Sequence, residues 1–390
     1  MKVFYFAYIV FADGPNSHAR GFISFFSKYV ERLDIIGIRQ ASKRFWQTVP
    51  KWKRFFKRLQ PDIYYDLNKL LANIGCLFKE YKELKQCKPD IIIFRYELYK
   101  LTPFLFSMLY KIPLVLEANG SAAYESNKFG THGNQRLAGF FEKRILRHAE
   151  AVYTVSNVLK NYFIKAYDNI DPSKYYTVPN GVDVKKMTPM DKEKAKQEIG
   201  FSDTFIVGFV GSFAPWHDID ILIQSAEKLR SKRIKYLLIG AGRKKEYYMN
   251  RVTRKRLDRT VIFLDPMSHE KIHLYLSAMD MTSALSLPTY GDDFHGSPIK
   301  LFEYMAMQKV VMATKFGQFM EIIRDHYNGF LIDLKDALQA EKAISECYHN
   351  PELLNVLGNN ARKTIIEKDL TWDGNAKRVF NICTHLLEKE

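Results

Sequence analysis

The sequence predicts an α/β protein with two Rossmann-like, doubly wound domains that face each other across a cleft. Short, continuous apolar runs alternate with longer stretches of helical period, which is typical of buried parallel strands joined by crossover helices. The runs fall into two series, separated by a Pro-Asn-Gly turn at 179–181 and a charged segment. The 390 residues suffice for each half to bury its own core.

The strands of the first series are expected at 3–10, 91–94, 114–117 and 151–155, and those of the second at 205–210, 236–239, 261–264, 281–284 and 310–313. We therefore expect a first domain at 1–185 and a second at 186–370. A helical stretch at 371–390 is expected to pack back on the first domain. Ligands of such sheets bind beyond the carboxyl ends of the strands, so chemistry is sought in the loops that follow them.

The charge of the chain favours anionic partners. There are 59 basic and 43 acidic residues, a net charge of +16, which suits phosphorylated small molecules, phospholipid headgroups or nucleic acid. Four cysteines without a C-x-x-C pair suggest a reducing compartment. The apolar start of the chain lacks a cleavage pattern, and the stretch 101–116 is interrupted by Pro103, Lys111 and Pro113. We expect a cytoplasmic protein.

A basic and aromatic segment at 39–60 contains eight Lys or Arg residues and no acidic residue. Its apolar side chains recur on one helical face, which is typical of a helix lying on an anionic membrane. A helix that packs on the domain with solvated charges is the structural alternative, and stacking on nucleic acid is a third. The residues expected to contact the membrane are Trp52, Lys53, Arg54, Phe55 and Phe56.

Two glycine-containing loops follow expected strands. Gly14 lies in a turn that leads into a helix, where free amides favour a phosphate, although a routine turn explains it equally well. Gly240 and Gly242 form half of a dinucleotide fingerprint, but Lys245 stands in place of its final glycine, so the pattern does not indicate NAD binding. Arg243 next to them could reach a diphosphate or simply be a solvated charge.

The segment 295–306 is the most informative part of the sequence. A turn after a strand leads into a helix whose first amides, with Lys300, are suited to bind a diphosphate. The carboxylate of Glu303 could accept hydrogen bonds from a ribose diol. The alternative is an ordinary capped helix with a solvated glutamate and no binding role. The residues expected at this site also include His295, Gly296, Ser297, Pro298 and Ile299.

A zinc site is an alternative reading of His269 and His273, which fit H-E-x-x-H. No third ligand follows at the expected spacing. Ile272, Leu276 and Met279 also form a core-facing stripe, which favours an ordinary amphipathic helix.

Five stretches together are more specific than any single motif. They are Leu116-Glu-Ala-Asn119-Gly120, Ala151-Val-Tyr-Thr-Val-Ser156, Val178-Pro-Asn-Gly-Val-Asp183, Val207-Gly-Phe-Val-Gly-Ser212 with Trp216-His217, and Ser297-Pro-Ile-Lys-Leu-Phe-Glu-Tyr-Met-Ala306. With these the chain resembles the GT-B glycosyltransferases of the retaining family 4, of the type called glycosyl transferases group 1.

The resemblance implies that the second domain binds a nucleotide sugar, UDP- or GDP-linked, and that the first binds the acceptor. Glu303 matches the glutamate that holds the ribose, and His295 stands where another glutamate usually contacts the sugar. Ser212 and His217 stand near positions that bind the diphosphate, a charge that Lys300 and Arg243 would supply here. Asn119 stands at an acceptor-side catalytic position often held by histidine, and Gly14 is similar to the first-domain loop.

The implied chemistry is a front-face substitution in which Lys300 and helix amides stabilise the leaving diphosphate, with no metal or other cofactor required. The basic aromatic segment suggests a lipid-linked or polysaccharide-precursor acceptor at the cytoplasmic membrane face, and nucleic acid is not an expected partner. Three alternatives remain open at this point: a non-catalytic basic module that binds membrane or nucleic acid, a zinc hydrolase, and a GT-B nucleotide-sugar epimerase.

Overall fold

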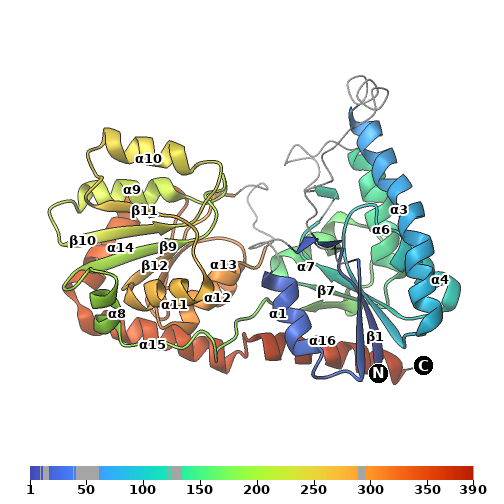
Figure 1. Cartoon of the computed structure of the whole chain (residues 1–390). Helices are drawn as coiled ribbons and strands as arrows, with labels where there is room; N and C mark the ends of the chain where they lie inside the picture. Colours follow the sequence, from blue (N-terminus) through green and yellow to red (C-terminus); the bar gives the residue numbers. More distant parts are fainter. Residues whose placement is uncertain are drawn as a thin grey trace. The chain divides into compact units, whose positions relative to one another are not determined.

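The computed structural model describes residues 1–8, 10–11, 17–37, 39–40, 61–121, 123–124, 134–288 and 296–389. The chain divides into two compact units, each built on its own sheet (Figure 1). Unit 1 comprises Met1–Pro179, His295–Ser297 and Trp372–Glu390, and unit 2 comprises Asn180–Phe294 and Pro298–Thr371. The passage between them at Pro179 and Asn180 lies a few residues before the boundary expected at 185.

Unit 1 is built on a parallel six-stranded sheet in the order β3-β1-β5-β6-β7-β8. The chain adds β3 on one side of β1 and then β5 to β8 on the other side. The switch point of this sheet therefore lies between β1 and β5. A separate parallel pair consists of β2 (Val10–Phe11) and β4 (Arg39–Gln40). The strands of the main sheet are β1 (Lys2–Phe6), β3 (Arg32–Ile36), β5 (Ile91–Arg95), β6 (Leu114–Ala118), β7 (Ala151–Thr154) and β8 (Tyr175–Thr177).

Helices cover both faces of this sheet. Phe4 and Phe6 of β1 pack on one face with α3 (Pro61–Gln86), α4 (Thr102–Tyr110), α6 (Gln135–His148) and α7 (Asn157–Ala166). Val3 and Tyr5 pack on the other with α1 (Ser17–Phe26) and α16 (Trp372–Leu387). The C-terminal helix therefore belongs to unit 1, where it completes the cover of a face that α1 alone would leave partly open.

Unit 2 is built on a second parallel six-stranded sheet, in the order β11-β10-β9-β12-β13-β14. Its first strand, β9, lies in the middle, so the switch point falls between β9 and β12. The strands are β9 (Phe205–Val210), β10 (Ile234–Ile239), β11 (Val261–Leu264), β12 (Met281–Ala284), β13 (Val310–Thr314) and β14 (Phe330–Ile332). Together with unit 1, this confirms the predicted α/β class with two doubly wound sheets.

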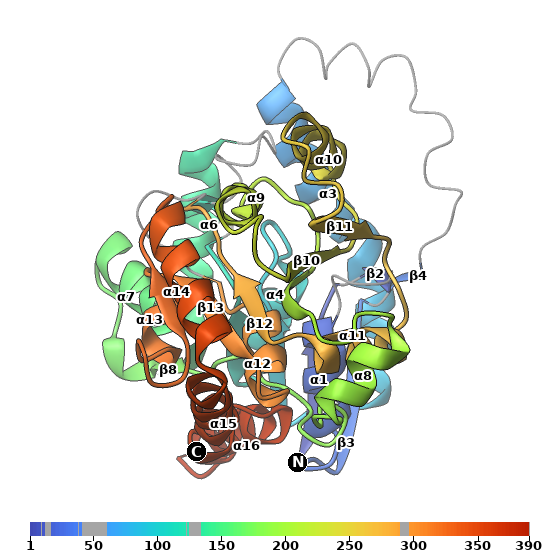
Figure 2. The same ribbon diagram turned by 90° about the vertical axis from the view of Figure 1, so that its left-hand side faces the viewer.

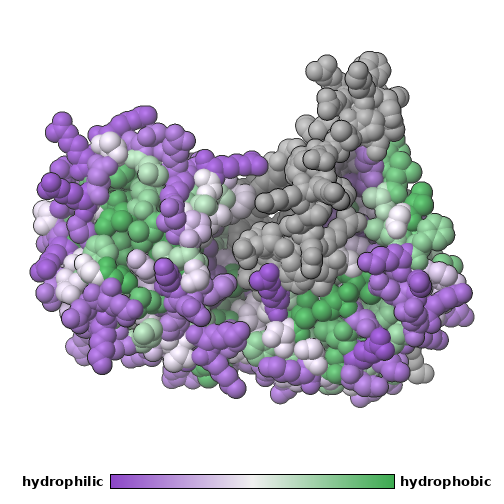
Figure 3. Space-filling model, viewed as in Figure 1, coloured by the Kyte–Doolittle hydropathy of each residue, from purple (hydrophilic) through white to green (hydrophobic). Residues whose placement is uncertain are grey.

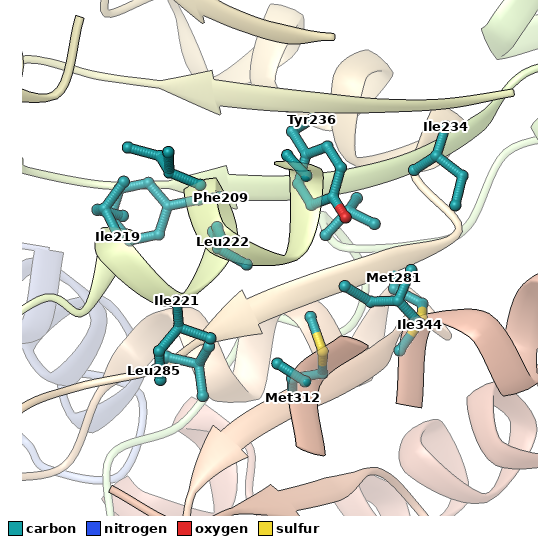
Figure 4. Close-up of a cluster of buried hydrophobic side chains, with 14 of the residues drawn as sticks. Phe209, Ile219, Ile221, Leu222, Ile234, Tyr236, Met281, Leu285, Met312 and Ile344 are labelled. Carbon is teal, nitrogen blue, oxygen red and sulfur yellow. The ribbon is translucent and has the colours of Figure 1, made fainter. Parts of the chain in front are cut away.

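The two faces of the second sheet are covered by two sets of helices (Figure 2). Side chains that alternate along β9 divide between them, because successive residues of a strand point to opposite faces. Val207 and Phe209 pack in the cluster of Figure 4 with α9 (Ile219–Lys228), α10 (Lys245–Arg254) and α14 (Ala337–His349). Ile206 packs with α8 (Lys192–Glu198), α11 (His269–Ala278), α12 (Ile299–Ala306), α13 (Gln318–Ile322) and α15 (Pro351–Glu367).

The strands that the sequence did not predict lie at the edges of the sheets. β3 carries polar residues between its apolar ones, and β8 and β14 have only three residues each, so none forms a continuous apolar run. Among the helices of the described residues, none combines the length and the hydrophobicity needed to cross a membrane.

Candidate functional site

The loops that follow β9 and β10 at the carboxyl edge of the sheet in unit 2 pack closely against each other. An added Cβ on Gly240 would lie 1.9 Å from the carbonyl oxygen of Gly211, and one on Gly242 would lie 2.5 Å from the backbone nitrogen of Phe213. Both glycines have positive φ angles, at 142° and 154°. The Gly-x-Gly pair predicted as half a nucleotide fingerprint therefore has a packing reason of its own.

Tyr304 fixes α12 against the end of β9. Its hydroxyl donates to the Val210 carbonyl at 3.1 Å and accepts from the Val210 amide at 2.8 Å. The helix begins after Pro298, which has no amide hydrogen and which, as the N-cap residue, provides no side-chain cap. Leu301 donates its amide to the Pro298 carbonyl at 2.9 Å, so the amides that can face a ligand at the carboxyl edge of the sheet are those of Ile299 and Lys300.

Lys300 lies in this first turn with its charge among apolar and neutral groups. Its Nζ lies 4.3 Å from the centroid of the Phe209 ring and 3.3 Å from His217 Nε2. A Cβ added to Gly211 would lie 2.6 Å from Nζ, so the glycine leaves the space that the ammonium occupies. The ion pairs found among the described residues do not include Lys300. The charge of Glu303, further along the same helix, acts on Lys300 without a direct contact. A half-enclosed cation without a direct ion pair makes this position suited to an anion.

Burial sets the protonation states of Lys300 and His217. Burial lowers the pKa of Lys300 to about 7, against a smaller opposite effect of Glu303. Burial and the nearby Lys300 charge lower the pKa of His217 to about 2, so the imidazole is neutral. When Lys300 is protonated it donates to His217 Nε2, which leaves the proton of the ring on Nδ1. That atom is buried and has no hydrogen-bond partner among the described residues.

Glu303 lies one turn further along α12. Burial raises the pKa of its carboxyl group, and the nearby His269 and Lys300 only partly counter this effect. No side chain in the described part of the chain donates a hydrogen bond to Glu303. Lys300 and Glu303 thus present a cation and a carboxylate acceptor on one short helix.

The remaining predicted residues of this site differ in exposure. Ser212 and Arg243 are exposed, whereas Gly296, Ser297, Pro298 and Ile299 are half-buried at or just before the start of α12. His295 and Gly14 lie outside the described residues, and so do Trp52, Lys53, Arg54, Phe55 and Phe56. Their predicted roles stay predictions.

In unit 1, Glu117 at the end of β6 is the centre of a buried network. Arg95 Nη1 and Asn119 Nδ2 donate to its Oε1 at 2.7 and 2.6 Å. The hydroxyls of Tyr5 and Tyr153 donate to its Oε2 at 2.7 and 2.9 Å. Burial raises the pKa of Glu117, but Arg95 and the hydrogen bonds outweigh burial and hold the pKa below its usual value. The carboxylate is therefore charged, and it fixes the amide of the half-buried Asn119.

His18 joins this network from the first turn of α1, at the switch point of the sheet. Arg95 Nη1 contacts His18 Nδ1, and because a guanidinium can only donate, Nδ1 is the acceptor and Nε2 carries the proton. Burial and Arg95 lower the pKa of His18 to about 3, so its approach to Glu117 at 3.6 Å is not an ion pair. The ring stands edge-on to Trp372 of α16, with 5.5 Å between centroids.

Sequence reasoning missed His18, Arg95, Tyr5 and Tyr153. One signal was available, because Glu117 interrupts a buried apolar strand, and a buried carboxylate needs donors. Arg95 and Tyr153, which lie opposite Glu117 in the two neighbouring strands, are two of those donors.

Within the described residues, the alternative zinc site at His269 and His273 gains no third ligand. His273 Nε2 lies 2.7 Å from the Thr188 carbonyl oxygen, to which it can only donate, so that nitrogen carries a proton. His269 is exposed at the start of α11. In the described part of the chain, no three His, Cys, Asp or Glu side chains are grouped so that they could hold a metal.

Two family models match the chain. The model of the glycosyl transferases group 1 matches residues 191–364, and that of glycosyltransferase family 4 matches residues 64–186. A glycosyltransferase of Methanocaldococcus jannaschii is 20% identical over 379 residues, covering 85% of this chain and 93% of that protein. The D-inositol 3-phosphate glycosyltransferase of Mycolicibacterium smegmatis is 27% identical over 267 residues, covering 66% of this chain but only 59% of that enzyme.

Solved structures share the fold. HepE of Anabaena in complex with UDP aligns with a TM-score of 0.74 at 17% identity, over 99% of this chain and all of that one. The sucrose-phosphate synthase of Thermosynechococcus elongatus aligns with a TM-score of 0.75 at 16% identity, over the full length of both chains.

Proposed function

We propose that this chain, a group 1 glycosyltransferase with the GT-B fold, moves a sugar from a UDP- or GDP-linked donor to a hydroxyl acceptor, with retention of the anomeric configuration. Unit 2 would bind the donor and unit 1 the acceptor. The observation that carries the proposal is Lys300, an enclosed amine that forms no described ion pair and lies at the N-terminal turn of α12. HepE, which shares the fold, has been solved with UDP and with UDP-glucose.

The donor is held by complementary charge. The diphosphate would lie against the first turn of α12, where Lys300 and the amides face its oxygens. As the glycosidic bond to the diphosphate breaks, negative charge grows on the leaving oxygen, and these groups stabilise it where it develops. No metal is required in this proposal, because the ammonium and the helix amides supply the positive charge. Glu303 would accept hydrogen bonds from the ribose hydroxyls.

The acceptor would meet the network of unit 1. Glu117 holds the Asn119 amide in one orientation, with the amide oxygen free to accept from a hydroxyl of the acceptor. His18 is neutral and presents an Nε2 proton, so it would donate to the acceptor rather than act as a base. The departing phosphate would take the proton of the attacking hydroxyl.

The acceptor class and the location are parts of the same proposal. We infer a lipid-linked or polysaccharide-precursor acceptor at the cytoplasmic membrane face, with the protein bound peripherally to anionic lipid. The charge of +16 supports this, and the basic segment 39–60 remains a predicted contact with the membrane.

Calorimetric titration with UDP, GDP and their common sugar conjugates tests the donor half. The protein should bind one base selectively, and Glu303→Ala should weaken binding about 10- to 100-fold, because hydrogen bonds to a charged group are lost. Glu352→Ala, an exposed glutamate on α15, is the matched control and should bind as the wild type does. Equal affinities of wild type and Glu303→Ala would remove Glu303 from the site, and no binding of any nucleotide would contradict the donor proposal.

A further inference from the structure

An exposed apolar stripe runs along α3 in unit 1. Leu67, Leu71, Ile74 and Phe78 recur at the spacing of one helical face, yet they are 53, 60, 57 and 74% exposed. Figure 3 shows hydrophobic side chains gathered over this helix, at the right of the view. Scattered apolar residues are normal on a surface, but a continuous stripe indicates a contact with another surface.

The neighbouring helix α4 extends the stripe. Leu105, Met108 and Leu109 are 37, 50 and 73% exposed. The two helices contact each other, and the rings of Tyr81 and Tyr110 lie 6.5 Å apart between them. We call these seven side chains the α3–α4 face: Leu67, Leu71, Ile74, Phe78, Leu105, Met108 and Leu109.

The charges around this face are positive. Lys82 and Lys85 follow Phe78 by one and two turns and are exposed, and Lys111 is exposed just past the end of α4. The described acidic residues of α3 lie elsewhere: Asp66 and Glu80 are buried, where they accept from the Asn134 amide and the Tyr8 hydroxyl. Glu83 lies on the opposite side of the helix from Phe78 by its spacing.

We propose that the α3–α4 face docks unit 1 on an anionic lipid bilayer. An apolar stripe about one helix wide, ending in lysines and free of acids, is the pattern of an interfacial helix, and its lysines match anionic headgroups. A second copy of the chain would instead bring the same cations toward one another. The inference deepens the proposed function and rests on it, because unit 1 is the half assigned to a lipid-linked acceptor.

Vesicle flotation tests the face directly. The wild type should float with vesicles of phosphatidylcholine and phosphatidylglycerol, and weakly with phosphatidylcholine alone. Leu71→Glu with Phe78→Glu should lower partitioning about a hundredfold, because each lost apolar contact with lipid is worth about tenfold. The matched control is Leu338→Glu with Val356→Glu in unit 2, two apolar side chains that are 56 and 49% exposed. Both double variants should unfold at wild-type temperatures, since all four side chains are largely exposed.

Three results would overturn the proposal. One is equal flotation of the α3 variant and the wild type. Another is loss of flotation in Trp52→Glu with Phe55→Glu while the α3 variant still floats, which would assign the membrane contact to the 39–60 segment instead of the α3–α4 face. The third is a wild-type dimer that becomes monomeric in the α3 variant without any vesicle binding, which would make a second copy the occupant.

UDP titration of the same proteins separates this proposal from the proposed function. Both double variants should bind UDP as the wild type does. A wild type that floats but binds no nucleotide would contradict the donor site and leave the docking face standing, whereas the reverse result would contradict only the face.

Discussion

Binding of a nucleoside diphosphate should draw a proton onto Lys300. In the free protein burial holds its pKa at about 7, below the ordinary value of 10.5. At pH 8 about 90% of the side chain is then neutral, and at pH 6 about 10% is. A diphosphate beside Nζ favours the ammonium and raises the pKa again, so binding should take up about 0.9 proton at pH 8 and about 0.1 at pH 6.

The assay is calorimetric titration with UDP, or with GDP if that base binds, at each pH in two buffers of different ionisation enthalpy. The difference in observed heat gives the number of protons taken up. Lys300→Arg is the control, because a guanidinium stays charged and should take up none. Subtracting the proton uptake of Lys300→Arg from that of the wild type also removes the protons that the nucleotide itself binds. Equal proton uptake by wild type and Lys300→Arg at pH 8 would refute the reasoning.

Two further predictions concern single side chains. Lys300→Met should have a free energy of unfolding in urea about 1–2 kcal/mol above that of the wild type at pH 6, and this advantage should disappear or reverse at pH 9. The sign follows because a lowered pKa in the folded state means that stability rises as pH increases from about 7 to 10.5, so the wild type lacks this stability below pH 7. Equal stabilities at pH 6 would show that the cation is not strained by burial. Asn119→Ala should reduce sugar transfer about 100-fold while leaving UDP affinity unchanged, because Asn119 lies in unit 1 and contacts only the acceptor in our proposal. A matching loss of UDP affinity would contradict that role.

Strands that are buried on both faces were readable from the sequence, because they form continuous apolar runs. The predicted runs 205–210 and 281–284 coincide with the central strands β9 and β12. β3 was missed because an edge strand can carry Arg32 and Asp34, which pair with each other at 2.8 Å on the exposed side. Short edge strands such as β14 leave too little pattern to recognise.

The site was predictable as a set of residues but not as a set of contacts. The sequence pointed to Lys300 and His217 separately, from a helix start and a family motif. Their approach to 3.3 Å depends on how the loop after β9 folds against α12, which no local pattern encodes. Likewise, Arg95 ends β5 and His18 lies in the first turn of α1, and only the order of the sheet brings them to Glu117.

The most direct test of the central claim is transfer of a labelled sugar. Radiolabelled UDP- and GDP-sugars would be incubated with the protein and a lipid extract, with EDTA present, and the label followed into the organic phase. We predict transfer from one donor, with a product whose anomeric configuration, read by NMR, equals that of the donor. Inversion would contradict the retaining mechanism. A donor consumed without acceptor, by hydrolysis or epimerisation, would contradict the transferase chemistry proposed for this site.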